Sequence, residues 1–386
     1  MKIEKIKVFV LTEHLDKSFY FSQWEYSQRK VCLVKITTDE GLIGWGEGYG
    51  PPDLLASGVG YLSTYVLGQN PLNSEAIWET LYRRTMDFSR SGVLMGAISA
   101  IDVAIWDLKG KILGLPVHQL LGGKKRDKIY PYATGLYFRE EKDLIHALVE
   151  EAIMYKEQGY RSIKMKVGMS IKEDIKHVEA VRKAIGNDVD LMIDANHAYN
   201  LHEALKLASA LNNLDIAWFE EPLSPEFYEQ HAELRSKTSI PVATGECEYL
   251  RFGFHRLLKN NSADILQPDI CACGGLTEAK RIATVASVYG VEIVPHSWGT
   301  FIALSAAMHF VANQDSIPGR LKMRKFTMEY DRTVNSIRDK VTFPDFEVKD
   351  GTLIISDKPG LGVEVDENAL VQYLDKNKNI KNEFSL

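Results

Sequence analysis

Ionisable side chains recur at the C-terminal ends of short apolar runs in the second part of the chain. In chain order they are Lys164, Lys166, Asp194, Glu220, Glu246, Asp269, His296 and Glu329. From Lys166 onward, neighbouring members are 23 to 33 residues apart, which is the length of one strand–helix unit. If these strands form one parallel barrel sheet, their C-terminal ends share one face. We therefore expect the eight side chains to converge there.

Three members of this set, on consecutive predicted strands, are the carboxylates Asp194, Glu220 and Glu246. They would repel one another in a partly dry site unless a cation neutralised them. Oxygen ligands of this kind suit a hard divalent ion such as Mg²⁺. One such acid is equally well a helix cap, but three at unit spacing favour a metal site. Asn196 and Glu221 are expected to support the ligands.

The basic members suggest proton transfer. Lys164 and Lys166 are two residues apart, so they face the same side of a strand. Two adjacent ammonium groups lower each other's pKa, which lets one act as a base, although solvated surface lysines are the alternative. A histidine alone is more often a core residue, but Asp269 could orient His296 as a second base. Glu329, if protonated, could hydrogen-bond an enolised carboxylate.

Together these groups suit removal of a proton from the carbon next to a carboxylate. That proton is very weakly acidic because its loss gives a dianionic enediolate. A metal ion, with Lys164 and Glu329 beside it, would stabilise the developing charge. Lys166 and His296 would stand on opposite faces of the substrate. One can remove the proton, while the other returns it or protonates a leaving hydroxyl.

The runs that carry these residues alternate with helical patterns. The runs are Ile129 to Thr134, Ser162 to Val167, Val189 to Asp194, Ile216 to Glu220, Ile240 to Thr244, Asp264 to Gln267, Val291 to Pro295 and Phe326 to Glu329. Helical apolar spacing follows in segments such as Glu141 to Gln158, Lys172 to Ile185 and Leu201 to Leu211. This alternation predicts an α/β fold of the (β/α)₇β TIM-barrel type, with an irregular last unit. An open doubly wound sheet is the alternative, but its Gly-rich phosphate fingerprint is missing.

The N-terminal part has a different pattern. Lys5 to Leu11, Val31 to Thr37 and Leu42 to Glu47 are predicted strands, and Glu13 to Lys30 is a predicted loop rich in aromatic residues. Glu75 to Leu113 has helical spacing, and short strands return after Lys340. We predict an α+β capping domain at residues 1–125, to which residues 340–386 return, and a barrel domain at residues 126–339.

The bulk composition narrows the possible partners. A net charge of -6 argues against nucleic acid or an anionic membrane, and the basic run Arg320, Lys322, Arg324 and Lys325 is typical of a solvated loop. The four cysteines lack zinc-knuckle or redox spacing, which favours reduced thiols. No run approaches a membrane span, and the first ten residues resemble a strand rather than a signal peptide. We expect a cytoplasmic homo-oligomer that binds a small carboxylate.

Seven short segments resemble the enolase superfamily, in particular its mandelate racemase subgroup. They are Lys164-Met-Lys166, Asp194-Ala-Asn196, Glu220-Glu221-Pro222, Gly245-Glu246, Gln267-Pro268-Asp269, His296-Ser-Trp298 and Met328-Glu329-Tyr330. The resemblance extends over nearly the whole chain, including the helix Ala97 to Lys111. It implies a cap that closes over the barrel, metal ligation by Asp194, Glu220 and Glu246, and base chemistry by Lys166 and by His296 with Asp269.

The resemblance also bears on the reaction. The segments Asp194 to Tyr199, Gln267 to Gly275 and Met328 to Thr333 look most like acid-sugar dehydratases and galactarolactone cycloisomerases. Dehydration of an aldonate or aldarate to a 2-keto-3-deoxy acid is the first expectation. A racemase, epimerase or sugar-lactone cycloisomerase is the alternative. A barrel that binds a metal and an acid without turnover is a third.

Substrate specificity in such a fold would lie in the cap. The candidates are in the aromatic loop and the turn Gly48 to Asp53, where polar groups could bind hydroxyls and aromatic rings could wall off the distal end of the substrate. They are His14, Phe19, Tyr20, Gln23, Trp24, Arg29 and Tyr49.

Overall fold

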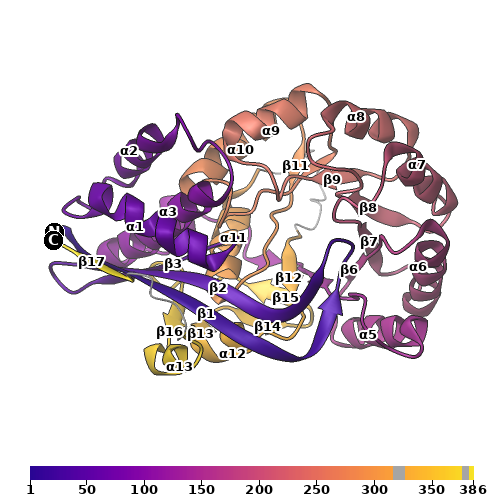
Figure 1. Ribbon diagram of the computed structural model, residues 1–386, viewed down its shortest axis with the longest axis horizontal. Helices are drawn as coiled ribbons and strands as arrows, with labels where there is room; N and C mark the ends of the chain where they lie inside the picture. The colour runs from indigo at the N-terminus through magenta and orange to yellow at the C-terminus, as the bar shows by residue number, and fades with distance from the viewer. Residues whose placement is uncertain (316–326, 376–381) are drawn as a thin grey trace.

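The computed structural model describes residues 1–315, 327–375 and 382–386. The basic run at Arg320 to Lys325 and the start of the last predicted barrel strand, Phe326, lie outside the described residues. Figure 1 shows a ring of strands and helices with a second group of helices and strands beside it. Both chain termini lie in that second group, at the side away from the ring.

The ring is built on an eight-stranded parallel sheet. In sheet order the strands are β12 (Glu329–Asp331), β5 (Tyr132–Thr134), β6 (Ser162–Lys166), β7 (Asp190–Asp194), β8 (Ile216–Glu220), β9 (Val242–Thr244), β10 (Ile265–Leu266) and β11 (Glu292–Ile293). The helices around it are α5 (Leu144–Glu157), α6 (Ile171–Ile185), α7 (Leu201–Ala210), α8 (Tyr228–Lys237), α9 (Leu250–Lys259), α10 (Gly275–Tyr289) and α11 (Phe301–Asn313). The α/β barrel architecture with an antiparallel cap is therefore confirmed.

Two predicted strand boundaries differ from the structure. The first barrel strand begins at Tyr132, because Ile129 belongs to β4 (Lys128–Ile129) and pairs with Leu353 in a separate sheet. The last strand begins at Glu329 and runs to Asp331, whereas the sequence placed Glu329 at its end. Glu329 is therefore on the predicted strand, but at its N-terminal end, two residues before the strand ends.

Strand periodicity explains why the lysines point into the barrel. Along β6, Ile163 and Met165 join the layer that packs against the helices. Lys164 and Lys166 alternate with them, so they face inward, and both are buried. The inward-facing apolar side chains form their own cluster, which comprises Tyr132, Met192, Trp218, Ala243, Ile265 and Val294.

The predicted loop from Glu13 to Lys30 is wrong. These residues mostly continue two long antiparallel strands, β1 (Ile3–Tyr20) and β2 (Glu25–Thr38), which pair with a register shift between His14 and Phe19. The strands persist because their tip packs on the barrel: backbone hydrogen bonds join Tyr20 and Phe138 in both directions, at 2.7 and 3.0 Å. In Figure 1 the hairpin extends from the cap across the ring toward β6.

The rest of the cap packs helices on this sheet. Its elements are β3 (Ile43–Gly48), α1 (Pro52–Val66), α2 (Ser74–Thr85) and α3 (Val93–Leu113), followed by the short α4 (Val117–Leu120). The single helical segment predicted from Glu75 to Leu113 is thus two helices. β3 approaches α3 so closely that a Cβ on Gly46 would lie 2.1 Å from the carbonyl oxygen of Ala100, so glycine is required there.

The C-terminal segment returns to the cap and to the barrel. Its elements are α12 (Ser336–Val341), β13 (Thr342–Pro344), β14 (Glu347–Lys349), β15 (Thr352–Ile354), β16 (Val363–Val365), α13 (Glu367–Gln372) and β17 (Glu383–Ser385). β17 pairs with β1, whereas β15 pairs with β4. The division at residues 125/126 and 339/340 stays a prediction. Within the described residues, no helix is both long and apolar enough to cross a membrane.

Buried carboxylates of the cap hold the first turns of two barrel helices. Glu47 accepts hydrogen bonds from the Thr300 N–H and hydroxyl and from the Ala303 N–H, where α11 begins. Asp102 accepts from the Thr277 N–H and hydroxyl, where α10 begins. A helix N-terminus has unpaired N–H groups and a positive dipole end, both of which favour an acid. These contacts fix how the cap sits on the barrel.

Candidate active site

Lys164 lies among three buried carboxylates. Its Nζ is 2.9 Å from Glu329 Oε1 and 3.4 Å from Asp194 Oδ2, and it also donates a hydrogen bond to Glu220. Burial alone would lower the pKa of this ammonium, but the surrounding carboxylates raise it well above the ordinary lysine value.

Lys166 is held by a second set of contacts at the end of β6. Its Nζ is 2.5 Å from Asp194 Oδ2 and 2.8 Å from Asn196 Oδ1, and it lies 4.9 Å from the centre of the Tyr137 ring. Burial opposes the charge, but Asp194, Tyr137 and Glu246 together raise the Lys166 pKa. Lys164 does lower the pKa of its neighbour, as expected of paired lysines, but the surrounding acidic groups outweigh this effect, so the expected net decrease is wrong for this arrangement.

His296 follows β11 and contacts Asp269, as the sequence suggested, and it lies near two further acids that the sequence did not predict as its partners. Its Nδ1 is 2.6 Å from Asp269 Oδ2, and its Nε2 lies 3.5 Å from Glu246 Oε2 and 3.7 Å from Glu329 Oε2. Although burial lowers the pKa of an imidazole, these three acids raise the His296 pKa to about 10. Asp269 therefore holds an imidazolium whose Nε2–H faces the site.

Glu329 differs from the expectation of a protonated acid. Burial would raise its pKa, but Lys164 and His296, with hydrogen bonds from the Thr134 hydroxyl and the Ser297 N–H, lower it to about 2. An ionised Glu329 cannot donate a hydrogen bond to a substrate oxygen. In this arrangement the Lys164 ammonium, 2.9 Å from Glu329, is the group that can donate a hydrogen bond to a substrate oxygen there.

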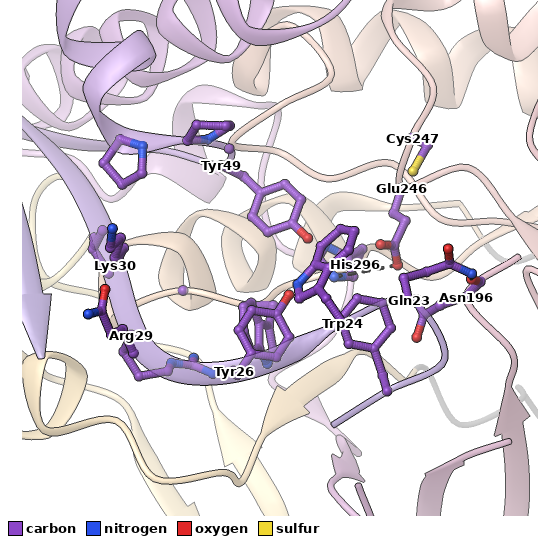
Figure 2. Close-up of a pocket in the computed structure, with 18 of the residues that line it drawn as sticks. Gln23, Trp24, Tyr26, Arg29, Lys30, Tyr49, Asn196, Glu246, Cys247 and His296 are labelled. Carbon is purple, nitrogen blue, oxygen red and sulfur yellow. Dashed lines mark hydrogen bonds and ion pairs between the residues drawn. The ribbon is translucent and has the colours of Figure 1, made fainter. Parts of the chain in front are cut away.

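A cavity of about 640 Å³ connects these groups to the cap. Lys166, His296, Glu246 and Glu329 line its floor, and its wall includes seven aromatic side chains. The aromatic residues are Phe21, Trp24, Tyr26, Tyr49, Tyr137, Tyr249 and Trp298. Figure 2 shows Trp24, Tyr26 and Tyr49 on the cap side of His296. The cavity thus combines a charged floor with a largely aromatic wall.

Of the seven residues predicted to contact the substrate, four line the cavity and three do not. Gln23, Trp24, Arg29 and Tyr49 line the cavity. The other three have contacts elsewhere: His14 pairs with Gln28, Phe19 packs on Tyr26 and Tyr137, and the Tyr20 hydroxyl donates to Glu140. His14, Phe19 and Tyr20 do not line the cavity.

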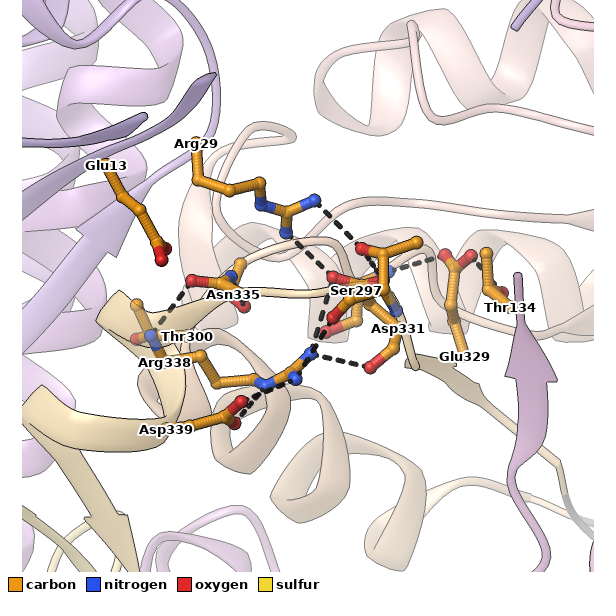
Figure 3. Close-up of polar contacts among 12 residues, drawn as sticks. Glu13, Arg29, Thr134, Ser297, Thr300, Glu329, Asp331, Asn335, Arg338 and Asp339 are labelled. Carbon is orange, nitrogen blue, oxygen red and sulfur yellow. Dashed lines mark hydrogen bonds and ion pairs between the residues drawn. The ribbon is translucent and has the colours of Figure 1, made fainter. Parts of the chain in front are cut away.

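Arg29 is buried and already paired. Its guanidinium lies 2.7 Å from Asp331 Oδ2 and stacks 3.7 Å over the Trp298 ring. Figure 3 shows Arg29 and Arg338 both directed at Asp331, beside Glu329 and Thr134. Arg29 therefore connects the hairpin to the last barrel strand and supports the Trp298 wall, so its charge is not free for a second substrate carboxylate.

Several residues of the site were not singled out from the sequence. Tyr137 follows β5 by three residues, and Tyr26 lies in the segment that was predicted as a loop. Gln267 and Trp218 both donate to Glu220 Oε2, at 2.7 and 2.8 Å, and so orient that carboxylate. The aromatic residues of the hairpin were a visible signal, whereas Tyr137 had none beyond its distance from a strand end.

The predicted metal ligands fit a hard divalent cation in type, and they lie at or just after the ends of three consecutive barrel strands. Asp194 and Glu220 are register partners at the ends of β7 and β8, and Glu246 follows β9 by two residues. All three carboxylates are largely buried, and their oxygens are the donors that Mg²⁺ prefers. Here Asp194 and Glu220 pair with lysine ammonium groups while Glu246 faces His296, so the three do not gather around one point.

Two family models match consecutive parts of the chain. The N-terminal domain of mandelate racemase and muconate lactonizing enzymes matches residues 5–122, and the enolase C-terminal domain-like model matches residues 147–369. The chain belongs to the enolase superfamily, in its mandelate racemase and muconate lactonizing enzyme family.

Relatives of this enolase superfamily member include cycloisomerases and dehydratases. The crystal structure of the 3,6-anhydro-D-galactonate cycloisomerase from Zobellia galactanivorans has 52% identity, covers 97% of this chain and 100% of its own, and has a TM-score of 0.90. A D-galactarolactone cycloisomerase from Agrobacterium fabrum is 39% identical over 97% of this chain and 99% of its own length. An arabinonate dehydratase from Saccharolobus solfataricus is 33% identical over 89% and 90%.

A fourth relative bears on the metal. A racemase from Streptomyces coelicolor A3(2), solved with bound magnesium, is 26% identical, covers 96% of this chain and 99% of its own, and has a TM-score of 0.86. The protein is thus an enzyme of a superfamily whose members use Mg²⁺ and act on acid sugars among other substrates.

Proposed function

We propose that this enzyme is a cycloisomerase of a cyclic sugar acid. It removes the proton α to the substrate carboxylate and breaks the β carbon–oxygen bond of the sugar ring. The product is an open-chain 2-keto-3-deoxy acid of the same composition. The observation that carries the proposal is the similarity to two proteins named as cycloisomerases, at 52% and 39% identity over 97% of the chain, against 33% for the arabinonate dehydratase.

The aromatic wall of the cavity supports a cyclic substrate. Aromatic rings such as Trp24, Tyr26 and Trp298 offer flat apolar faces to the C–H groups of a sugar ring. Arg29 is engaged by Asp331, but the exposed Lys30 also lines the cavity, so the lining does not distinguish one substrate carboxylate from two. The wall therefore favours a cyclic sugar acid, of which 3,6-anhydro-D-galactonate is a named example, over an open-chain one.

We propose the following roles for the charged floor. Lys164 donates a hydrogen bond to the substrate carboxylate, and Lys166 takes the α proton. His296, held as an imidazolium by Asp269, protonates the departing ring oxygen, which becomes the new hydroxyl. The resulting enol then loses its hydroxyl proton and gains a proton at the β carbon, which gives the keto acid with no atom gained or lost overall.

We also propose that Asp194, Glu220 and Glu246 hold Mg²⁺. Bound there, the cation would offset the charge that develops on the substrate carboxylate and would compete with the lysines for these oxygens, lowering the lysine pKa. Asn196, which joins Lys166 to Glu221, and Glu221 itself would keep the ligand-bearing segments in place.

Dehydration, the first expectation from the sequence, remains the second candidate. The arabinonate dehydratase relative favours it, and the same acid at His296 would then protonate a leaving hydroxyl instead of a ring oxygen. The two reactions differ in mass balance, because dehydration releases water.

The test is to incubate the purified enzyme and Mg²⁺ in D₂O with 3,6-anhydro-D-galactonate, D-galactarolactone, D-galactonate and D-arabinonate, following products by NMR and mass spectrometry. We expect a cyclic acid to give an open-chain 2-keto-3-deoxy acid, unchanged in composition apart from deuterium at the former β carbon. If open-chain aldonates are converted while both cyclic acids are untouched, the cycloisomerase assignment is wrong and dehydration takes its place.

A further inference from the structure

A second cluster of potential metal ligands lies beside the carboxylate floor. In the part of the chain that the structure describes, one group of three His, Cys, Asp or Glu side chains brings its ligand atoms within 4.8 Å of one another, and it comprises His197, Glu221 and Cys247. We name it the His–Glu–Cys cluster. His197 and Cys247 line the cavity, and Figure 2 shows Cys247 next to Glu246.

The imidazole of His197 has its lone pair directed into this cluster. Nδ1 lies 3.2 Å from the carbonyl oxygen of Leu223, which can only accept, so Nδ1 carries the proton. In the neutral ring Nε2 is then unprotonated, and it faces Glu221 Oε2 at 3.1 Å and Cys247 Sγ at 3.6 Å. A metal-ligating histidine usually donates its other ring N–H to a carbonyl or carboxylate in this way.

Glu221 supplies a second, independent observation. Its side chain is fully buried and directed at His197, yet Oε1 has no hydrogen-bond partner among the described residues. The other oxygen, Oε2, is contacted by Asn196 Nδ2 at 3.4 Å and by His197 Nε2 at 3.1 Å, and the Cys247 thiol hydrogen-bonds to the same carboxylate. Buried carboxylates are normally paired, hydrogen-bonded or bound to a metal.

The two separations that involve His197 are close to those of a tetrahedral zinc site, and Glu221 and Cys247 lie within 4.8 Å of each other. With Zn–N of roughly 2.0–2.1 Å and Zn–S of ~2.3 Å, tetrahedral angles place the nitrogen and sulfur ligands roughly 3.5 Å apart. His197 Nε2 and Cys247 Sγ are 3.6 Å apart. Two oxygen or nitrogen ligands would be roughly 3.4 Å apart on the same geometry, and the His197–Glu221 pair is at 3.1 Å.

We propose that His197, Glu221 and Cys247 form a second metal site, for a thiophilic divalent cation of the Zn²⁺ class. Its nitrogen and sulfur donors distinguish it from the all-oxygen set of Asp194, Glu220 and Glu246, because thiolate and imidazole select softer ions than Mg²⁺. The fourth position faces the cavity. A cation there is held by residues adjacent to Glu220 and Glu246, so its binding regulates the active site by immobilising the segments that carry those acids.

The site can be tested by its spectrum, independently of turnover. Co²⁺ is titrated into the enzyme with Mg²⁺ in excess, and the near-ultraviolet thiolate-to-cobalt charge-transfer band and the visible bands of tetrahedral cobalt are recorded. We expect one equivalent to give both signals and Zn²⁺ to displace them. Cys247→Ser should lose the charge-transfer band, and His197→Gln should weaken binding by at least roughly tenfold, the loss seen when a supporting group of a metal site is removed.

The matched controls are Cys32→Ala and Asp194→Asn. Cys32 is a buried thiol in the cap sheet, remote from the cluster, so its loss should leave the cobalt spectrum unchanged. Asp194→Asn removes an oxygen of the other site and should also leave the band. The proposal is overturned if the wild type gives no thiolate band, if the band survives Cys247→Ser, or if Asp194→Asn or Mg²⁺ removes it.

Discussion

Lys166 and His296 face the same cavity from β6 and from the segment after β11, and a different set of acids holds each of them. Asp194 and Asn196 fix the Lys166 ammonium, whereas Asp269 fixes the His296 ring. Because each group has its own anchor, replacing one need not displace the other. The proposed roles of Lys166 as the base and His296 as the acid can therefore be tested by replacing one side chain at a time.

The first prediction concerns these two residues. Lys166→Met should abolish exchange of the α proton of the cyclic acid with D₂O, because Lys166 is the base proposed to remove that proton. His296→Asn should keep this exchange but lower ring opening by roughly the 10²- to 10⁴-fold that a general acid contributes. Proton NMR of substrate and product measures both rates. The opposite pattern would exchange the two roles, and full activity in both variants would refute the two-group mechanism.

At the scale of residues, the sequence predicted which charged residues meet in the site, but it did not predict their protonation states. Spacing along the chain places Lys164 and Lys166 on one face of β6, as the structure has them. It does not give the distances to Glu220, Asp194 and Glu329 across the sheet, and those contacts reverse the expected direction of the lysine pKa. The role of Cys247 was missed for the same reason, since its partners are 26 and 50 residues away in the chain.

At the scale of elements, the β1–β2 hairpin is the main surprise. Its tip is held by the barrel, with the Ser22 hydroxyl donating to the Ala195 carbonyl at 2.7 Å and the Gln23 amide donating to the Asn196 carbonyl at 2.9 Å. Barrel strands could be predicted because each is a short apolar run followed by a helical pattern, and the structure buries these runs on both faces. The polar and aromatic hairpin tip lacks such a run, because its stability comes from contacts with a partner element far away in the chain.

The second prediction concerns the joint between β3 and α11. Burial raises the pKa of Glu47 from 4.5 to about 7, despite hydrogen bonds from Thr300 and Ala303 that lower it. The folded protein thus binds this proton more tightly than the unfolded chain does. Its contribution to the free energy of unfolding is complete below about pH 4.5 and is lost as the pH rises through 7. At ~1.4 kcal/mol per pH unit, the window corresponds to about 3 kcal/mol.

Glu47→Gln should remove this part of the pH dependence, because the amide keeps the shape and does not ionise. Chemical denaturation at pH 5 and pH 8 measures the free energy of unfolding of both proteins. The wild type should lose about 2.5 kcal/mol more than the variant between the two conditions, because part of the window lies below pH 5. Glu364→Gln, at an exposed position of β16, is the control and should follow the wild type. Equal slopes for wild type and Glu47→Gln would contradict the assignment.

At the scale of the whole molecule, the two ends of the chain meet on one strand. β17 forms an edge pair with β1, in which Lys5 is opposite Ser385, and Phe384 packs against Gly60 of α1. The far end of the same β1 strand carries the hairpin tip that covers the barrel. The last residues of the sequence therefore support the sheet from which the cavity wall extends.

The third prediction is that removing residues 382–386 destabilises the cap while leaving the barrel floor intact. The deletion breaks main-chain hydrogen bonds such as those from the Val8 N–H to the Asn382 carbonyl and from the Leu386 N–H to the Glu4 carbonyl. It also exposes the apolar surface that the half-buried Phe384 covers, so we expect a loss of about 1–2 kcal/mol, mostly from burial of that ring. Thermal unfolding should begin at a lower temperature, and KM should rise more than kcat falls, because the cap supplies the wall of the cavity and the barrel supplies its charged floor.

Phe384→Ala is the matched control and should reproduce most of the stability loss with the strand pairing retained. If the truncated enzyme lost kcat with an unchanged KM, the cap and the barrel floor would not be separable in this way.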